Sequence, residues 1–147
     1  MAKKKKKRIN AMKNARKALS DAQQVSANLV TISERREFID KFTLCEITCK
    51  SLIISNQKYN GTYKKDAEIR LLLKSIKAAI SYAGLTIPEH ILNGVFSSTG
   101  NYRKRNSKSA KLLRNGIVHA LNKEDINEVH NRYIALMQVM DDFLSYF

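Results

Sequence analysis

The fold class is set by the C-terminal residues 123–147, which read KEDINEVHNRYIALMQVMDDFLSYF. Apolar side chains recur there every three or four residues, which is the period of one face of an α-helix. Two acids, Glu124 and Asp125, stand in the first turn, where negative charge complements the helix dipole. We therefore predict a helix from about Lys123 to the C-terminus.

The rest of the chain shows the same helical period and few turn signals. One proline and five glycines are too few for the turns of a sheet fold of 147 residues. Gly84 is placed as the residue after a helix end, and Pro88 suits the first turn of a helix. The spacing predicts helices over about 9–29, 33–55, 64–83, 88–95 and 108–121. We expect an all-α bundle of four to five helices.

Charge divides the chain into a tail and a domain. The chain has 27 Lys+Arg against 13 Asp+Glu, a formal net charge of +14, and a hydrophobic fraction of 44%, which excludes global disorder. Residues 3–8 are six consecutive bases. Because like charges repel and nothing there can be buried, we interpret residues 1–8 as a disordered basic tail that adds affinity for RNA. Residues 9–147 are interpreted as a single helical domain.

The sequence shows no signal for a membrane, a cofactor or a metal. No apolar run approaches the roughly 18–20 residues of a membrane span, and no apolar stretch follows the basic N-terminus as in a secretory signal. Cys45 and Cys49 share one helical face with apolar neighbours, and no second Cys/His pair lies close by in sequence. We interpret them as buried core thiols and not as half a zinc site. Two cysteines give no disulfide framework, so we expect a reducing, cytoplasmic location.

A second basic block precedes and enters the helix predicted over 108–121. No acid occurs between Glu89 and Glu124, whereas basic residues are dense from Arg103 to Arg114. Such asymmetry is typical of a polyanionic partner, most often a nucleic acid, and the alternative is a solvated loop. Tyr102 is the candidate for stacking on a base. The candidate RNA contacts are Tyr102, Arg103, Lys104, Arg105, Lys108 and Lys111.

Residues 112–121, LLRNGIVHAL, have apolar residues at helical spacing, but a charged residue interrupts this apolar pattern. At about 100° per residue, Arg114 falls within the apolar face of its helix. An arginine there is costly unless a partner neutralises it or its charge reaches the surface. Gly116, in mid-helix, costs about 1 kcal/mol against alanine and indicates the close approach of another backbone. In one interpretation Arg114 is a surface residue; in the other, Arg114 and His119 line a cleft for an anion.

The stretch Arg114-Asn115-Gly116-Ile117-Val118-His119 resembles the R-x4–6-H motif of the HEPN superfamily (higher eukaryotes and prokaryotes nucleotide-binding domains). In that family a polar residue often follows the arginine, the motif lies in the penultimate helix, and an amphipathic helix closes the chain. The resemblance covers roughly residues 33–147. It implies a HEPN-like helical bundle and a metal-independent endoribonuclease of the toxin or defence type. It also implies a homodimer with a composite site and an antitoxin or regulatory partner.

The resemblance also implies roles for three residues. His119 transfers protons to or from the RNA 2′-hydroxyl and the 5′-oxygen, Arg114 stabilises the charge on the scissile phosphate, and Asn115 orients the phosphate or His119. Arg114 and His119 are about 140° apart on the helix, which suits a site that two copies share. Leu121 departs from the family pattern. It stands where toxins that are paired with nucleotidyltransferase antitoxins often have a tyrosine, so silencing by that route is not expected.

Two other functions remain open at this point. One is a non-catalytic HEPN-like module that binds RNA, a nucleotide or a partner protein. The other is a small helical nucleic-acid-binding protein, such as a helix-turn-helix regulator, without a HEPN relation. No short helix–turn–helix unit stands out, and the basic residues cluster before the best helix instead of along it. A preference for duplex DNA over RNA would favour the regulator.

Overall fold

The structure is a computed structural model that describes residues 11–20, 32–98 and 108–147. The chain divides into two units, Met1–Ile32 and Ser33–Phe147. In the first unit, residues 11–20 form a helix that carries no buried side chain. The predicted tail, residues 1–8, lies outside the described residues, and the predicted domain 9–147 spans both units.

Helices are the only regular secondary structure in the described part of the second unit, which confirms the all-α prediction. The region 32–98 and 108–147 contains no strand, and no helix of the described residues is long and apolar enough to cross a membrane. Its helices are α2 (Ile32–Asn60), α3 (Leu73–Tyr82), α4 (Glu89–Phe96), α5 (Ala110–Ala120), α6 (Lys123–Asn131) and α7 (Tyr133–Leu144).

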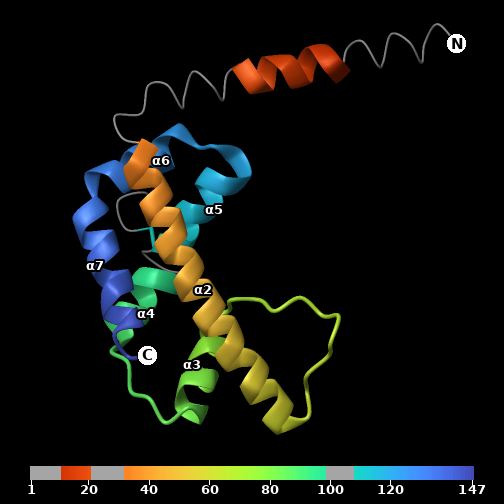
Figure 1. Cartoon of the computed structure of the whole chain (residues 1–147), viewed down its shortest axis with the longest axis vertical. Helices are drawn as coiled ribbons and strands as arrows, with labels where there is room; N and C mark the ends of the chain where they lie inside the picture. Colours follow the sequence, from red (N-terminus) through yellow and green to blue (C-terminus); the bar gives the residue numbers. More distant parts are fainter. Residues whose placement is uncertain (1–10, 21–31, 99–107) are drawn as a thin grey trace, which may run out of the picture. The chain divides into compact units, whose positions relative to one another are not determined.

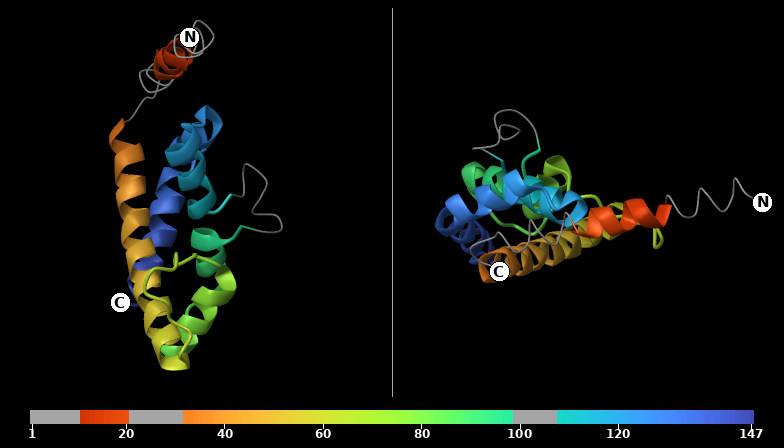
Figure 2. Two further views of the ribbon diagram at one scale, coloured as in Figure 1. Left: turned by 90° about the vertical axis from the view of Figure 1, so that its right-hand side faces the viewer. Right: turned by 90° about the horizontal axis from the view of Figure 1, so that it is seen from above.

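The long helix α2 forms one side of the second unit, and α3 to α7 lie along its other side (Figures 1 and 2). Phe42 of α2 is buried, with its ring centroid 6.2 Å from that of Phe96 in α4. Phe96 in turn meets the ring of Phe143 in α7 edge-on at 5.1 Å. The buried positions of α2 recur every three or four residues, so this helix packs by one stripe. They are Phe38, Phe42, Cys45, Cys49 and Ile53.

The helix predicted over 64–83 is wrong in its first half. Residues 64–72 contain no helix, and α3 begins only at Leu73. Leu71 is buried, and its carbonyl oxygen accepts a hydrogen bond from Lys111 Nζ at 2.8 Å. Tertiary contacts thus outweigh the local helical period. The end of α3 agrees with prediction, because Gly84 adopts a φ of +74° directly after the C-cap residue.

The single helix predicted from Lys123 onward is divided at Arg132. This residue has φ −111° and ψ 17°, outside the helical range, and separates α6 from α7. Its side chain donates from Nη1 to the carbonyl oxygen of Lys108 at 2.9 Å. The apolar spacing nevertheless continues through the break, from Val129 to Leu136, which explains why the sequence does not reveal it.

Candidate functional site

A pocket of about 560 Å³ opens between α2, α5 and the segment that leads into α3. The lining residues are Glu46 and Lys50 of α2, residues 68–72, and Lys111, Arg114, Asn115 and His119 of α5. All three predicted catalytic residues therefore line one pocket, together with Lys111 from the predicted RNA contacts. We call it the Arg114 pocket.

Helix α5 presents these residues because of how it is seated in the core. Its buried positions are Ala110, Leu113 and Ile117. The N-cap hydroxyl of Ser109 accepts from the Leu112 backbone N–H and donates to the Ser97 carbonyl oxygen at 2.5 Å, which fixes the start of the helix. With that face turned inward, the residues at 111, 115 and 119, four apart, form a neighbouring stripe along the pocket.

Arg114 is held inside the pocket by two partners on α2. Its Nη2 donates to Glu46 Oε2 at 2.8 Å, and its guanidinium carbon lies 4.7 Å from the centre of the Phe42 ring. The side chain is 18% exposed, and Nε is buried without a hydrogen-bond partner among the described residues. A cation on an aromatic face, paired with a carboxylate, accounts for an arginine on an apolar helix face. The prediction that Arg114 lies on the apolar side of its helix is confirmed.

Sequence reasoning missed Glu46. It lies 68 residues from Arg114, so no local pattern joins them. One signal was present in the sequence, because Glu46 is the single acid between Lys41 and Asn60. An acid that stands alone among apolar and neutral side chains over residues 42–49 is a reasonable candidate partner for a cation elsewhere in the chain.

Lys111 adds positive charge that is partly removed from solvent. Its Nζ donates to the Leu71 carbonyl oxygen, and burial lowers the pKa of its ammonium group. The nearby charges of Arg114 and Arg70 lower that pKa further. The positive charges that disfavour protonation of Lys111 also favour binding of an anion, because an anion reduces the repulsion among them.

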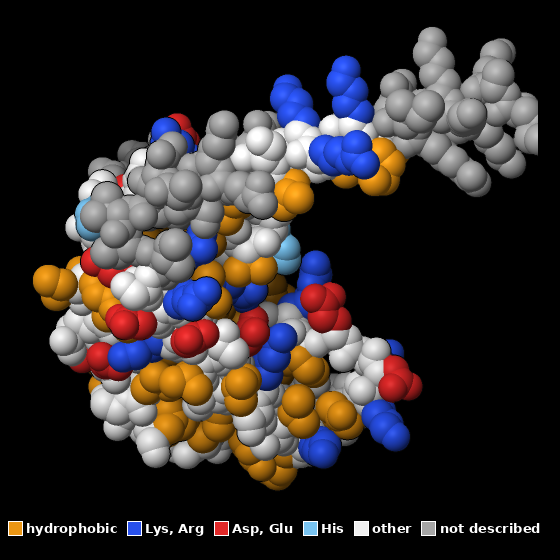
Figure 3. Space-filling view, turned by 45° about the horizontal axis from the view of Figure 1, so that its top comes forward, with side chains coloured by type: hydrophobic (Ala, Val, Ile, Leu, Met, Phe, Trp, Pro, Cys, Tyr) orange, Lys and Arg blue, Asp and Glu red, His pale blue; other side chains and the backbone are white. Residues whose placement is uncertain are grey.

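Charges of both signs meet at this pocket. Glu46 and Glu68 line it beside Lys50, Arg70, Lys111 and Arg114. Elsewhere on one face of the molecule, basic and acidic side chains are also interleaved, with hydrophobic side chains exposed beside them (Figure 3). The pocket itself is lined by four bases and two acids, and it includes the predicted catalytic residues.

Lys108, predicted as an RNA contact, faces a different partner. Its Nζ donates to Asp125 Oδ1 at 2.8 Å, and the Asp125 side chain is only 3% exposed. Lys108 does not line the Arg114 pocket. The other predicted contacts, Tyr102, Arg103, Lys104 and Arg105, lie outside the described residues.

Gly116 is explained by the same carboxylate. A Cβ atom added to Gly116 would lie 1.8 Å from Asp125 Oδ2 and 2.8 Å from its Cγ. The prediction that another backbone approaches Gly116 is therefore wrong, because the close neighbour is a buried side chain. The glycine lets α6 come near enough to α5 for Asp125 to reach Lys108.

His119 and Asn115 complete the pocket. His119 is exposed and Asn115 is half-buried, so both can be reached from solvent. Among the described residues, no hydrogen bond to the His119 ring is present. The other two histidines, His90 and His130, do not line the pocket, and His130 Nδ1 lies 2.8 Å from Glu34 Oε2.

The two cysteines are core residues, as predicted. Cys45 and Cys49 are free thiols with at most 1% of their surface exposed. Burial raises the pKa of Cys45 to about 12, aided by the charge of Asp141, and burial also raises the pKa of Cys49. Within the described residues, no three His, Cys, Asp or Glu side chains form a group that could hold a metal ion.

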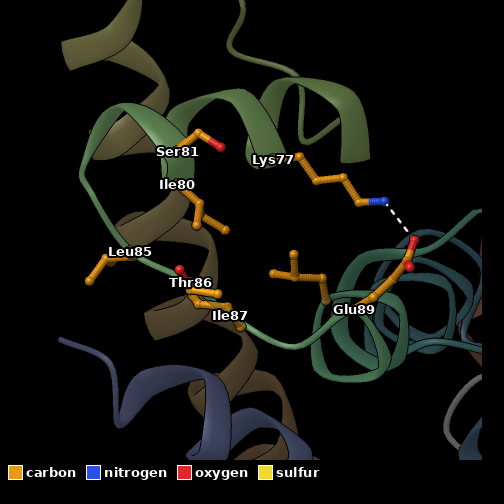
Figure 4. A pocket seen from close by; sticks show the side chains of 8 residues that line it. Lys77, Ile80, Ser81, Leu85, Thr86, Ile87 and Glu89 are labelled. Atoms are coloured by element: carbon orange, nitrogen blue, oxygen red, sulfur yellow. Dashed lines mark hydrogen bonds and ion pairs between the residues drawn. The ribbon is translucent and has the colours of Figure 1, made fainter.

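A second pocket, of about 350 Å³, lies between α3, α4 and the loop that joins them (Figure 4). Ile80, Ile87 and Leu92 give it apolar walls. Its two charged lining residues pair with each other, since Lys77 Nζ donates to Glu89 Oε1 at 2.9 Å. That hydrogen bond lowers the pKa of the Glu89 carboxyl. With its cation already paired, this pocket is a weaker anion site than the Arg114 pocket.

Comparison of the chain with protein-family models, with curated proteins and with solved structures finds no match. The HEPN relation that residues 114–119 suggest therefore stays a prediction.

Proposed function

We propose that this chain is a metal-independent endoribonuclease with a HEPN-like fold, acting in the cytoplasm as a toxin or defence effector. The observation that carries the proposal is the Arg114 pocket. It gathers Arg114, Asn115 and His119 in one recess, beside further cations suited to an RNA backbone.

In the proposed reaction, His119 takes the proton of the RNA 2′-hydroxyl as the 2′-oxygen attacks the adjacent phosphorus. The bond from phosphorus to the 5′-oxygen breaks, and an imidazolium gives that oxygen a proton. The products are a 2′,3′-cyclic phosphate and a 5′-hydroxyl. Histidine is the side chain that most often carries out such proton transfers.

Arg114 supplies positive charge where the phosphate becomes more negative. Glu46 engages Nη2, so Nη1 is the nitrogen that we assign to the phosphate oxygen. The carboxylate and the Phe42 ring hold the guanidinium in one place, so little reorganisation is needed when charge develops. Asn115 orients the phosphate or the imidazole.

We assign the complete site to two copies of the chain. The His119 imidazole of one copy then takes the 2′-hydroxyl proton and returns it to the leaving 5′-oxygen, while Arg114 of the other copy holds the phosphate. His119 is exposed, and Val118 next to it is an apolar side chain with 52% of its surface exposed. An exposed apolar residue next to His119 in sequence suits a surface that a second copy covers. An antitoxin or regulatory protein is a further partner in this proposal.

The test is cleavage of mixed RNAs in EDTA by the purified full chain. We expect cutting by the parent protein, none by Arg114→Ala or His119→Ala, and normal cutting by His90→Ala, a histidine outside the pocket. Cutting by His119→Ala at the parent rate would show that the assignment is wrong. Products that lack a cyclic phosphate would contradict the 2′-hydroxyl mechanism.

A mixing experiment tests the shared site. Arg114→Ala and His119→Ala proteins are each inactive, but a mixed dimer still holds one arginine and one histidine. If two copies share the site, mixing the two variants restores part of the activity. If each chain has a complete site, the mixture stays inactive.

The alternative is a non-catalytic HEPN-like module that binds RNA, a nucleotide or a partner protein. One observation favours it, because Glu46 pairs with Arg114 and offsets its charge. Intact RNA after incubation with the parent protein, together with RNA binding that Arg114→Ala weakens, would support this alternative.

A further inference from the structure

Two exposed tyrosines meet at the end of α2 and α3 that lies away from α6. Tyr59 of α2 has 74% of its surface exposed, and Tyr82 of α3 has 46%. Their ring centroids are 5.0 Å apart, with 35° between the ring planes. The C-terminal end of α2 and helix α3 lie side by side in both Figure 1 and Figure 2. The pair therefore presents aromatic faces from two different helices to the solvent.

Lysines are frequent in the segments that carry this tyrosine pair. Lys58 precedes Tyr59, and its Nζ lies over the ring of Tyr63, 4.9 Å from the ring centroid. On α3, Lys74 lies about two turns before Tyr82. The whole segment 57–77 is basic, with six bases against Asp66 and Glu68. The bases are Lys58, Lys64, Lys65, Arg70, Lys74 and Lys77.

This surface is separate from the Arg114 pocket. On α2, Tyr59 stands nine residues beyond Lys50, which lines the pocket. Nine residues advance a helix by about 13.5 Å and turn it by about 180°. The tyrosine pair therefore faces the opposite side of α2 from the pocket, and neither tyrosine lines a described pocket.

Exposed aromatic rings in a lysine-rich part of the chain suit one class of ligand better than others. A protein partner that prefers apolar contact has no need of the lysines, and a duplex keeps its bases stacked on one another. A single strand offers both phosphates for the lysines and free base faces for the rings. We propose that Tyr59 and Tyr82 form a second contact for single-stranded RNA, on which one or two bases stack.

The proposal goes beyond the Arg114 pocket and can be tested without cleavage. The full chain with His119→Ala serves as the parent, so that RNA stays intact during the measurement. Its dissociation constants for a labelled 12-nucleotide oligo(A) and for a 12-base-pair RNA duplex are measured by fluorescence anisotropy. Thermal unfolding of each variant shows that it is folded.

In this background, Tyr59→Ala should weaken oligo(A) binding by at least about fivefold, the lower limit for losing one stacked base. Tyr59→Phe keeps the ring and should bind within about twofold of the parent, as should the control Tyr146→Ala, a tyrosine near the C-terminus. Duplex binding should change little in all three variants. Because the chain has six tyrosines and no tryptophan, quenching of its intrinsic fluorescence by oligo(A) is a second readout.

The proposal would be overturned by unchanged oligo(A) binding by Tyr59→Ala, by an equal loss for single strand and duplex, or by no binding of oligo(A) by the parent. A loss in Tyr59→Phe equal to that in Tyr59→Ala would also show that stacking is not the cause. Cleavage by the protein with His119 intact is measured separately, so a failure of the ribonuclease proposal is told apart from a failure here.

Discussion

Replacing Gly116 by alanine should destabilise the protein strongly, although alanine is normally the better helix residue. The new Cβ would lie 1.8 Å from Asp125 Oδ2, so the carboxylate has to move. Asp125 is 2% exposed, and its other oxygen, Oδ1, is bonded to Lys108. Moving the carboxylate separates this pair and leaves a poorly solvated charge.

The expected change in the free energy of unfolding is the sum of two opposing effects. Breaking a buried ion pair costs about 3–5 kcal/mol. The gain in helix propensity from glycine to alanine returns about 1 kcal/mol. The net loss is about 2–4 kcal/mol, which for a domain of this size lowers Tm by roughly 8–16 °C. This loss is a large part of the 5–15 kcal/mol that stabilises a typical domain.

Thermal and urea unfolding followed by circular dichroism at 222 nm measure the effect, and a double-mutant cycle tests its cause. In an Asp125→Ala background there is no carboxylate to displace, so Gly116→Ala should be neutral or stabilising by up to about 1 kcal/mol. A Gly116→Ala protein as stable as the parent, or an equal loss in both backgrounds, would refute the reasoning.

Three further predictions concern single side chains. Glu46→Gln frees the charge of Arg114, so RNA should bind more tightly and the slope of log K against log salt should steepen by about 0.7; weaker binding or an unchanged slope would contradict this. The Tyr133 hydroxyl donates to a glutamate of α2, which raises the tyrosine pKa to about 12. Because the pKa is raised in the folded state, this hydrogen bond contributes its full stability below about pH 10, and the contribution is lost as pH rises toward 12. The free energy of unfolding in urea should therefore fall more between pH 9 and 11.5 for the parent than for Tyr133→Phe. Cys45 and Cys49 should react with Ellman's reagent only after unfolding, because both are buried and have raised pKa values; rapid reaction of the native protein would argue against a packed core around them.

The Gly116 result also bears on how the motif is interpreted. Gly116 lies between Asn115 and His119, so its replacement would lower activity in a cleavage assay by destabilising the fold around the pocket. Such a loss is no evidence for a catalytic role. Arg114→Ala and His119→Ala are the informative variants, provided that their unfolding curves show a folded protein.

Local patterns in the sequence determined much of the fold. The repeat of apolar residues every three or four positions predicted α2, α4 and α5, and placed Arg114 on the apolar side of its own helix. Gly84 marked a helix end, because a positive φ after a helix favours glycine. These features depend on residues within a few turns of one another, so they can be read from the sequence.

Only the tertiary structure decided the partners. Arg114 pairs with Glu46 across 68 residues, and Lys111 binds a carbonyl oxygen 40 residues away. The Asp125 side chain occupies the space next to Gly116. Residues 64–72 are not helical, and residues 68–72 line the pocket instead. A helical repeat tells which face of a helix turns inward, but the neighbour that meets that face is chosen by packing among helices far apart in the chain.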